Sequence, residues 1–400
     1  MRVSKRSKEI RYAIRDIVIE ANKIEKATGK KVLRCNIGDP TKFDFGPPTN
    51  LSVALGEVTC EKALNSGYAD SQGLLELREA ISKMEHNKGM DHPPEKILIT
   101  QGVSEGIEFL MGAIEPGDEI LLPGPHYPTY EGFSLFLGVV PKDYRCVEEN
   151  AWQPDLEDLE RKISEKTQAI VLINPNNPTG TVFSEDTIRR ICNLAGQHNL
   201  LLISDEIYDL LCFSTDRIVS TASVAGEVPV LTFNGISKTL VAPGWRVGWA
   251  MMHDPENVVS DFWDVLNRQS RIRLSASSPE QAAVATVLNQ SETWDHLKEM
   301  KTKLLRRRNL IVKRMTEMDG VSLTSPEGAF YAFPKLTHPK WNADDWGFTL
   351  ELLKKEQTLV VPGSGFGKDF GSGHFRLVFL PQDEVLNAAM DSLESFLKHH

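Results

Sequence analysis

The sequence predicts an α/β fold in which a three-layer α/β/α large domain, with a seven-stranded and mainly parallel sheet, is joined to a smaller α+β domain. Short apolar runs alternate with helical patterns between residues 96 and 252, which is typical of a sheet covered by helices. Runs 170–173 and 200–203 are apolar throughout, as strands buried on both faces are. Beyond residue 318 short strands mix with helices, which indicates the second domain.

Composition sets the broad class. The chain has 400 residues, of which 41% are hydrophobic and 25% charged, enough for more than one globular domain. Its net charge of −10 argues against a nucleic-acid-binding surface. No apolar run approaches the roughly 20 residues that span a bilayer, so we expect no membrane segment. The five scattered cysteines form no CxxC pair, and without a signal or transit pattern they favour a reduced, cytoplasmic protein with no structural metal.

The N-terminal elements set the domain boundaries. Residues 10–27 place apolar side chains at helical spacing and predict an amphipathic helix. An apolar strand over 32–37 leads into a turn at Gly38, and the proline-containing stretch 43–50 is typical of a linker. We therefore expect a large domain at residues 50–290 and a small domain formed by residues 1–49 and 291–400.

Seven strand candidates form the predicted sheet: 96–100, 119–123, 139–144, 168–173, 200–204, 228–233 and 247–252. In open parallel sheets, ligands bind at the carboxyl ends of the strands. Five chemically notable residues follow such ends: Gly102, Tyr127, Asn177, Asp205 and Lys238. This coincidence predicts one site along that edge of the sheet.

The C-terminal region opens with a long charged helix over 290–318, whose lysines and arginines we interpret as a solvated face. Short strands are expected at 321–323, 329–333, 359–361 and 375–379. A final helix is expected from Asp383. These elements complete the small domain.

Lys238 ends the polar turn after the strand at 228–233. Ser237 precedes it, and Arg246 follows eight residues later. An amine beside a hydroxyl and a guanidinium suggests a covalent aldehyde carrier whose phosphate needs an anchor. Taken alone, an exposed loop lysine is the common alternative, because lysine is rarely buried.

Asp205 and Tyr208 follow the buried strand at 200–204. A carboxylate there is costly unless it is paired, and a protonated pyridine nitrogen is a suitable partner. Tyr208 can hydrogen-bond the oxygen of the same ring. Asn177, in Asn-Pro-Asn-Asn-Pro-Thr-Gly (174–180), can donate to that oxygen and also bind a carboxylate, although the motif alone is equally compatible with a tight turn.

The acidic pair after this strand has a competing interpretation. An apolar strand that ends in Asp205 and Glu206 resembles the Mg²⁺-binding motif of P-loop NTPases. That function also needs G-x-x-x-x-G-K-[ST]. The nearest match, 363–369, fails on spacing and ends in Asp369, which disfavours nucleotide binding.

Three further positions each have an explanation without a ligand. Ser104 opens a helix after a strand, where backbone N–H groups attract an anion but where helix capping is also ordinary. Tyr127 offers a flat face to an aromatic ring, or packs within its loop. Arg376 stands inside an apolar strand, where its guanidinium suits a bound carboxylate or a structural salt bridge.

Together these segments resemble the class I/II aminotransferases of fold type I, which use pyridoxal 5'-phosphate. The matching segments, in the family's order, are Asn-Pro-Asn-Asn-Pro-Thr-Gly (174–180), Ser-Asp-Glu-Ile-Tyr (204–208), Ser-Lys (237–238), Pro-Gly-Trp-Arg-Val-Gly (243–248) and His-Phe-Arg (374–376). Residues 36–45 and 363–367 resemble the alanine aminotransferase-like branch found in archaea and bacteria.

The resemblance implies roles at the cofactor ring. Lys238 holds the cofactor covalently and then moves the proton of the substrate. Asp205 keeps the pyridine nitrogen protonated, so that the ring accepts electrons. Asn177 and Tyr208 bond the ring oxygen, and Tyr127 stacks on the ring.

The resemblance also implies the phosphate and substrate contacts. The phosphate is held by Val103, Ser104, Ser237 and Arg246, with Tyr68 from a neighbouring subunit, which implies a homodimer with shared sites. The substrate carboxylate is bound by Arg376, with Asn177 and the backbone of Gly38. Gly235 departs from many relatives, which have a hydroxyl residue there, and implies one fewer phosphate contact.

The implied reaction is a ping-pong transamination between an L-amino acid, alanine by the branch resemblance, and 2-oxoglutarate. Aspartate or another amino acid is the alternative donor. The cluster Arg268, Arg271 and Arg273 suits a second carboxylate, but a subunit interface or surface cluster is the preferred interpretation. Lyases, synthases and non-catalytic cofactor sensors share the fold, and the combination of Lys238, Asp205 and Arg376 argues against a sensor.

Overall fold

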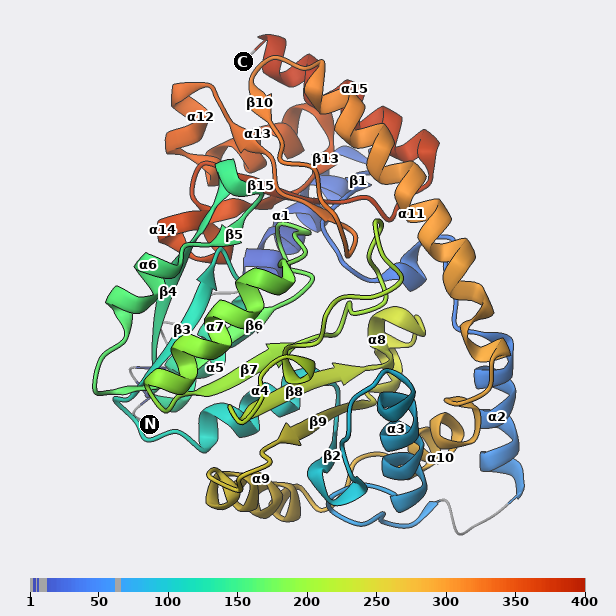
Figure 1. Ribbon diagram of the computed structural model, residues 1–400. Helices are drawn as coiled ribbons and strands as arrows, with labels where there is room; N and C mark the ends of the chain where they lie inside the picture. Colours follow the sequence, from blue (N-terminus) through green and yellow to red (C-terminus); the bar gives the residue numbers. More distant parts are fainter. Residues whose placement is uncertain (1–2, 5, 7–12, 62–65, 400) are drawn as a thin grey trace.

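An eight-stranded sheet forms the centre of the computed structural model, which describes residues 3–4, 6, 13–61 and 66–399 (Figure 1). Its order is β2-β9-β8-β7-β6-β3-β4-β5. The strands are β2 (Ile97–Thr100), β3 (Glu119–Gly124), β4 (Val140–Val147), β5 (Gln153–Pro154), β6 (Thr167–Ile173), β7 (Leu201–Asp205), β8 (Val230–Gly235) and β9 (Gly248–His253). Pairing is parallel from β8 to β4, whereas β9 runs antiparallel to both β2 and β8, and β5 to β4.

The seven predicted strands are all present, with small shifts at their ends, and the mainly parallel character of the sheet is confirmed. The predicted strand number was one too low. The additional strand, β5, has two residues, Gln153 and Pro154. A segment this short carries no alternating pattern from which a strand can be predicted.

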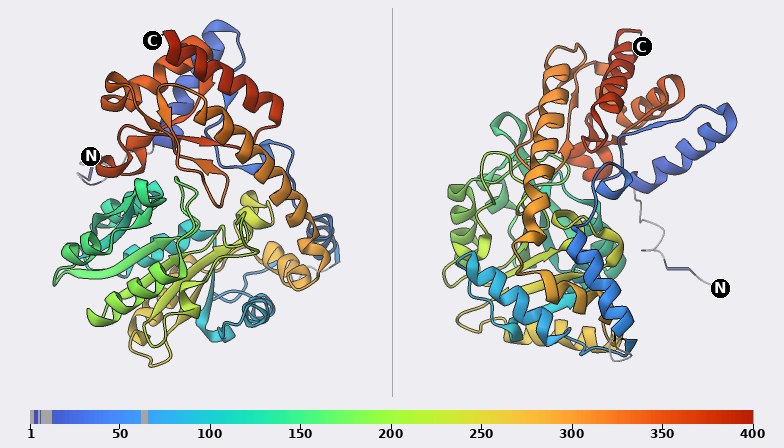
Figure 2. Two further views of the ribbon diagram at one scale, coloured as in Figure 1. Left: turned by 45° about the horizontal axis from the view of Figure 1, so that its top comes forward. Right: turned by 90° about the vertical axis from the view of Figure 1, so that its right-hand side faces the viewer.

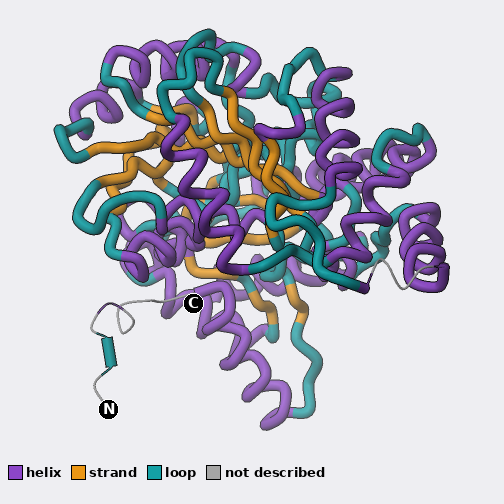
Figure 3. The backbone as a smooth tube through the Cα atoms, turned by 90° about the horizontal axis from the view of Figure 1, so that it is seen from below, coloured by secondary structure: helices purple, strands orange, loops and turns teal. Residues whose placement is uncertain are grey.

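Helices cover both faces of this sheet, which confirms the three-layer prediction; Figure 3 shows the strands enclosed by helices. Alternate residues of a strand point to opposite faces. Ile170 of β6 packs in one core with Ile188 of α7 (Glu185–Gln197). Its neighbour Val171 packs in the opposite core with residues of α4 (Val103–Gly112). Burial on both sides explains why this strand is apolar throughout.

The remaining helices connect and cover these layers. They are α1 (Ala13–Thr28), α2 (Thr49–Glu61), α3 (Leu75–Asn87), α5 (Pro128–Leu137), α6 (Leu156–Lys162), α8 (Ile236–Thr239), α9 (Ser260–Arg273), α10 (Ser278–Val287), α11 (Glu292–Thr316), α12 (Pro339–Ala343), α13 (Asp345–Glu356), α14 (Lys368–Gly371) and α15 (Asp383–His399). The helix predicted over 10–27 is present as α1, and its residues 10–12 lie outside the described residues.

The C-terminal strands form small sheets beside the large one. They are β10 (Val321–Ser322) with β12 (Lys335–Leu336), and β11 (Tyr331–Ala332) and β14 (Val361–Pro362) on either side of β15 (Phe375–Val378). The N-terminal β1 (Leu33–Arg34) pairs in parallel with β13 (Thr358–Leu359). Figure 2 shows the N-terminal segment, in blue, packed among the C-terminal elements, in red. This pairing supports the proposed division into residues 50–290 and a small domain built from both ends.

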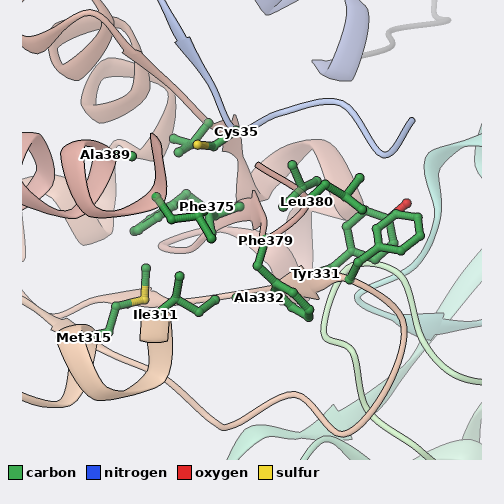
Figure 4. Packing of buried hydrophobic residues seen from close by; sticks show 14 of the residues in the cluster. Cys35, Ile311, Met315, Tyr331, Ala332, Phe375, Phe379, Leu380 and Ala389 are labelled. Carbon is green, nitrogen blue, oxygen red and sulfur yellow. The ribbon is translucent and has the colours of Figure 1, made fainter. Parts of the chain in front are cut away.

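A buried cluster joins these C-terminal elements, and Figure 4 shows Cys35, Phe375 and Met315 within it. Four of the five cysteines are buried, Cys60 is exposed, and all five are free thiols. Within the described ranges, no helix is both long and apolar enough to cross a membrane.

The charged face of α11 is largely accessible to solvent, as predicted for 290–318, and the prediction was wrong for Arg307. Arg307 of this helix is 1% exposed. Its guanidinium donates to both carboxylate oxygens of Asp44, at 2.7 and 2.8 Å, and to the Leu380 carbonyl at 2.6 Å. A charge run in the sequence cannot distinguish a solvated arginine from one that is buried with a partner.

Candidate active site

A cavity of about 900 Å³ lies at the carboxyl edge of the large sheet, and residues of the N- and C-terminal segments also line it. Of the predicted site residues, those in its wall are Gly38, Val103, Ser104, Tyr127, Asn177, Asp205, Tyr208, Ser237, Lys238, Arg246 and Arg376. The cavity size is typical of a site for a small organic ligand. These predicted residues therefore line one cavity along this edge, and their roles in a site stay a prediction.

Lys238 lies in α8, a single helical turn directly after β8. Its Nζ donates to the Gly38 carbonyl over 2.7 Å. Burial lowers the pKa of Lys238 to about 8, although the carboxylate of Asp39 opposes this shift. A substantial fraction of the amine is then neutral near physiological pH, and a neutral amine is the form that attacks a carbonyl.

Gly235 leads into this turn where β8 and β9 approach closely. Gly235 pairs with Gly248 across the two strands. A Cβ atom on residue 235 would stand 2.9 Å from the Gly248 Cα and 2.9 Å from the Val247 carbonyl oxygen. A side chain at this position would therefore require the two strands to move apart.

Asp205 ends β7 and is 3% exposed. Its Oδ2 accepts from the Tyr130 hydroxyl at 3.1 Å, and its Oδ1 accepts from the Ile207 amide at 3.3 Å. Burial nevertheless raises the pKa of Asp205 to about 6. A buried carboxylate in this state favours a cationic partner, because pairing restores the stability that desolvation removes.

Arg376 is buried at the opposite wall, on β15, with 1% exposure. Its Nη1 donates to the Asn177 side-chain oxygen at 2.9 Å, and its Nη2 donates to the Asn36 carbonyl at 2.7 Å. The guanidinium also lies over the Tyr331 ring, 4.6 Å from its centroid. These contacts fix the guanidinium at the cavity wall, and its planar fork suits a carboxylate as a ligand.

The remaining predicted residues gather at a second end of the cavity. Val103 and Ser104 begin α4, so the positive end of that helix and its first N–H groups lie there. Ser237 comes from α8. Arg246, an exposed residue with φ of 56°, donates to the Gln101 carbonyl at 3.0 Å and to the Pro243 carbonyl at 2.9 Å. Two hydroxyls, a helix start and a guanidinium form an anion site.

Gly102 allows the Arg246 guanidinium to lie close to the backbone before α4. Its φ of 72° lies in the region that glycine tolerates best. A Cβ atom at this position would collide with the guanidinium of Arg246. Tyr127 stands at the start of α5, partly buried, with its side chain in the cavity wall.

Two predicted features lie outside this cavity. Tyr68 is 84% exposed and lines a second hollow, together with Arg246 and Gln101. The cluster on α9 is also elsewhere: Arg268 is exposed beside Asp264, and Arg273 donates to the Ile99 carbonyl at 3.2 Å. The second-carboxylate role suggested for this cluster therefore has no support within one chain.

Comparison with known proteins identifies the family. The model of the class I and II aminotransferases matches residues 31–393. The chain belongs to the class I and II aminotransferases.

Similar family members cover the whole chain. An alanine aminotransferase structure from Pyrococcus furiosus is 45% identical, with a TM-score of 0.94 and complete coverage of both chains. The alanine aminotransferase of Mycobacterium bovis is 36% identical over 98% of this chain and 92% of its own length. The glutamate-pyruvate aminotransferase AlaA of Escherichia coli is 35% identical over 98% of this chain and 97% of its own length. Family membership overturns the NTPase alternative, and the glycine-rich segment 363–366 is a turn of 3-10 helix.

Class I and II aminotransferases use pyridoxal 5'-phosphate, and the donor set of this cavity fits it. The Lys238 amine suits its aldehyde, and the buried Asp205 suits its pyridinium nitrogen. The anion site formed by Ser104, Ser237 and Arg246 suits its phosphate.

Sequence reasoning missed two residues that line the aminotransferase cavity, Arg15 and Tyr331, and one behind it that bonds to a lining residue, Tyr130. Tyr130 looked like one of several apolar residues of a helix, and its bond to Asp205 joins residues 75 positions apart. Tyr331 lay in the apolar run 329–333 and resembled core. Arg15 looked like the charged face of an amphipathic helix, yet it lines the cavity. None of these has a local sequence signal, because each function depends on a distant neighbour.

Proposed function

We propose that this protein transfers the amino group of L-alanine to 2-oxoglutarate, with pyridoxal 5'-phosphate held by Lys238. The observation that carries the proposal is that a partly buried amine of lowered pKa, a buried carboxylate and a buried guanidinium share one cavity, at Lys238, Asp205 and Arg376. The choice of alanine is supported by relatives that match over nearly their whole length and are named alanine or glutamate-pyruvate aminotransferases.

The roles of the ring-binding residues follow from their surroundings. When bound, pyridoxal phosphate supplies an aldehyde that bonds covalently to an amine. It also supplies a ring that accepts the electrons left when a substrate C–H bond breaks. Asp205 holds the pyridine nitrogen protonated, and Tyr130 keeps the carboxylate oriented. Tyr208 and Asn177 donate to the ring oxygen, and Tyr127 covers the ring.

Lys238 and Arg376 act on the substrate. Arg376 binds the α-carboxylate, and its bonds to Asn177 and Asn36 fix where that carboxylate lies. Lys238, with a pKa of about 8, accepts the proton from the α-carbon and returns it in the next half of the reaction. The Gly38 carbonyl, 2.7 Å from Nζ, keeps the amine directed toward this region.

Arg15 supports a dicarboxylate as the second substrate. It is an exposed residue of α1 and lines the same cavity as Lys238 and Arg376. Alanine has no side-chain carboxylate, whereas 2-oxoglutarate and glutamate do. We infer that the Arg15 guanidinium binds this distal carboxylate. The sequence alone had suggested this role for the arginine cluster on α9.

The direct test is turnover by the protein loaded with pyridoxal phosphate. Incubation with L-alanine and 2-oxoglutarate should yield pyruvate and glutamate in equal amounts. L-Alanine alone should bleach the visible absorbance band of the loaded protein, and 2-oxoglutarate should restore it. A band that L-alanine leaves unchanged overturns alanine as the donor. Absence of any band after loading overturns the cofactor assignment itself.

Tyr68 supports a homodimer. Its ring is 84% exposed in one chain although it lies near the Arg246 loop. We infer that it completes the phosphate site of a neighbouring subunit.

A complementation experiment tests this inference. Tyr68→Ala chains and Lys238→Ala chains are mixed under mild denaturation and then refolded. Mixed dimers should regain activity, because one of their two sites then holds an intact Lys238 and the partner's intact tyrosine. If the mixture stays as inactive as its components, Tyr68 serves its own chain. A mass of one chain in light scattering overturns the dimer.

A further inference from the structure

Two tyrosine hydroxyls meet in the cavity wall. The Tyr331 and Tyr208 Oη atoms are 2.8 Å apart, and either can be the donor. Their rings stand edge to face, with centroids 5.7 Å apart at 89°. Tyr331 is 2% exposed and Tyr208 is 3% exposed. A hydroxyl pair buried in this way is a strong, geometrically fixed hydrogen bond.

The structure holds Tyr331 from three sides. Its backbone pairs with Val378 across β11 and β15. Its ring lies under the Arg376 guanidinium, at 4.6 Å. A Cβ atom on residue 38 would collide with its hydroxyl, so the hydroxyl occupies space that only glycine provides. Figure 4 shows the ring at one end of the buried cluster, beside Phe379 and Leu380.

The pair has two protons but only one bond between its oxygens. If Tyr208 donates to Tyr331, Tyr208 offers the cavity only lone pairs. If Tyr331 donates to Tyr208, the proton of Tyr208 is available to an oxygen in the cavity. An accepted hydrogen bond also polarises the accepting hydroxyl and strengthens its own donation. An anionic ring oxygen selects the second arrangement.

We propose that Tyr331 is a positioning residue that donates to Tyr208 and thereby makes Tyr208 a directed donor to the ring oxygen of pyridoxal phosphate. This inference rests on the proposed function. It gives the apolar run 329–333 a role at the site: the run supplies the hydroxyl that sets the direction of the Tyr208 bond. In this role Tyr331 acts through Tyr208.

The test is a double-mutant cycle on the loaded protein, with the pH midpoint of its visible absorbance band as the readout. A hydrogen bond donated to the ring oxygen stabilises negative charge on that oxygen. The nitrogen through which Lys238 holds the cofactor then loses its proton at a lower pH. Tyr208→Phe should therefore raise the midpoint. Tyr331→Phe, which keeps the ring under Arg376, should raise it by about half a unit to one unit. In the Tyr208→Phe background, Tyr331→Phe should add no shift.

The matched control is Tyr144→Phe. Tyr144 is also fully buried, and its hydroxyl donates to the Val171 carbonyl at 2.8 Å, away from the cavity. This variant loses a buried hydroxyl without changing the midpoint. An unshifted midpoint in Tyr331→Phe, or a shift that persists without the Tyr208 hydroxyl, overturns the inference. A protein that forms no band in any variant overturns the proposed function instead, so the two failures are distinct.

Discussion

The two ends of the cavity are built differently. At the ring end, Asp205 and Arg376 are buried and bonded to residues of the same chain. At the phosphate end, Arg246 is exposed and bonded only to the carbonyls of its own neighbourhood, with the exposed Tyr68 beyond it. The difference teaches that one chain completes the buried end by itself, whereas the end around Arg246 stays open to solvent, as the proposed contribution from a second chain requires.

Lys238 stands between these ends, and its removal should have the largest effect. Lys238→Ala should lower turnover by a factor of about 10⁴ or more, because both the covalent attachment and the proton transfer are lost. Pyridoxal phosphate should then be removable by dialysis, which absorbance measures. In the unmodified protein, the rate of attachment should rise with pH around a midpoint near 8. Turnover at the wild-type rate would contradict the assignment.

Asp205→Asn should separate stability from function at the ring end. Turnover should fall by about 10²–10³, as for loss of one preorganised electrostatic partner. Burial raises the pKa of Asp205 to about 6, above its unfolded value. The folded cofactor-free protein therefore binds this proton more tightly than the unfolded chain, and stability declines as pH rises from about 4 to about 6.

The variant removes that penalty. Above pH 6 its cofactor-free form should be more stable than wild type by about 3 kcal/mol, with no difference below pH 4. Denaturant unfolding at several pH values measures this. A cofactor-free variant that is less stable at pH 7 would show that the hydrogen bonds of the carboxylate outweigh its desolvation.

Arg246→Gln should give the opposite combination at the phosphate end. Affinity for pyridoxal phosphate should fall about tenfold, because one charge-assisted contact is lost. The melting temperature of the cofactor-free protein should stay close to that of wild type, since the side chain is exposed. Equilibrium dialysis and thermal unfolding report the two quantities. A large loss of cofactor-free stability would contradict the view that this end is an open anchoring site.

Arg15→Gln should have the smallest and most selective effect. The KM for 2-oxoglutarate should rise several-fold to about tenfold, with little change in the KM for alanine. Arg268→Gln is the matched control, because Arg268 is exposed on α9 beside Asp264 and outside the cavity. Equal effects of the two substitutions would remove Arg15 from the proposed specificity site.

The sequence predicted those site residues that can be recognised from their neighbours in the chain. Lys238, Asp205 and Asn177 each follow a buried strand, and a parallel sheet brings such ends together. Arg376 was recognisable because a guanidinium in an apolar strand needs a partner.

The rest depends on contacts between distant residues. Tyr130 and Tyr331 stand in apolar stretches of the sequence. Their hydroxyls contribute to the site only through their hydrogen bonds with Asp205 and Tyr208, respectively. The burial of Arg307 required knowledge of Asp44, 263 positions away. The two-residue strand β5 is too short to show any period.

The bond between Arg376 and the Asn36 carbonyl joins residues 340 positions apart, and it has a consequence for biosynthesis. A ribosome releases the chain from its N-terminus, so the loop at residue 36 is made long before β15 exists. Lys238 can meet the Gly38 loop earlier, but the bond from Arg376 can form only when nearly all of the polypeptide has emerged. A nascent chain therefore lacks the wall that Arg376 contributes, and the complete cavity forms only after translation is almost finished.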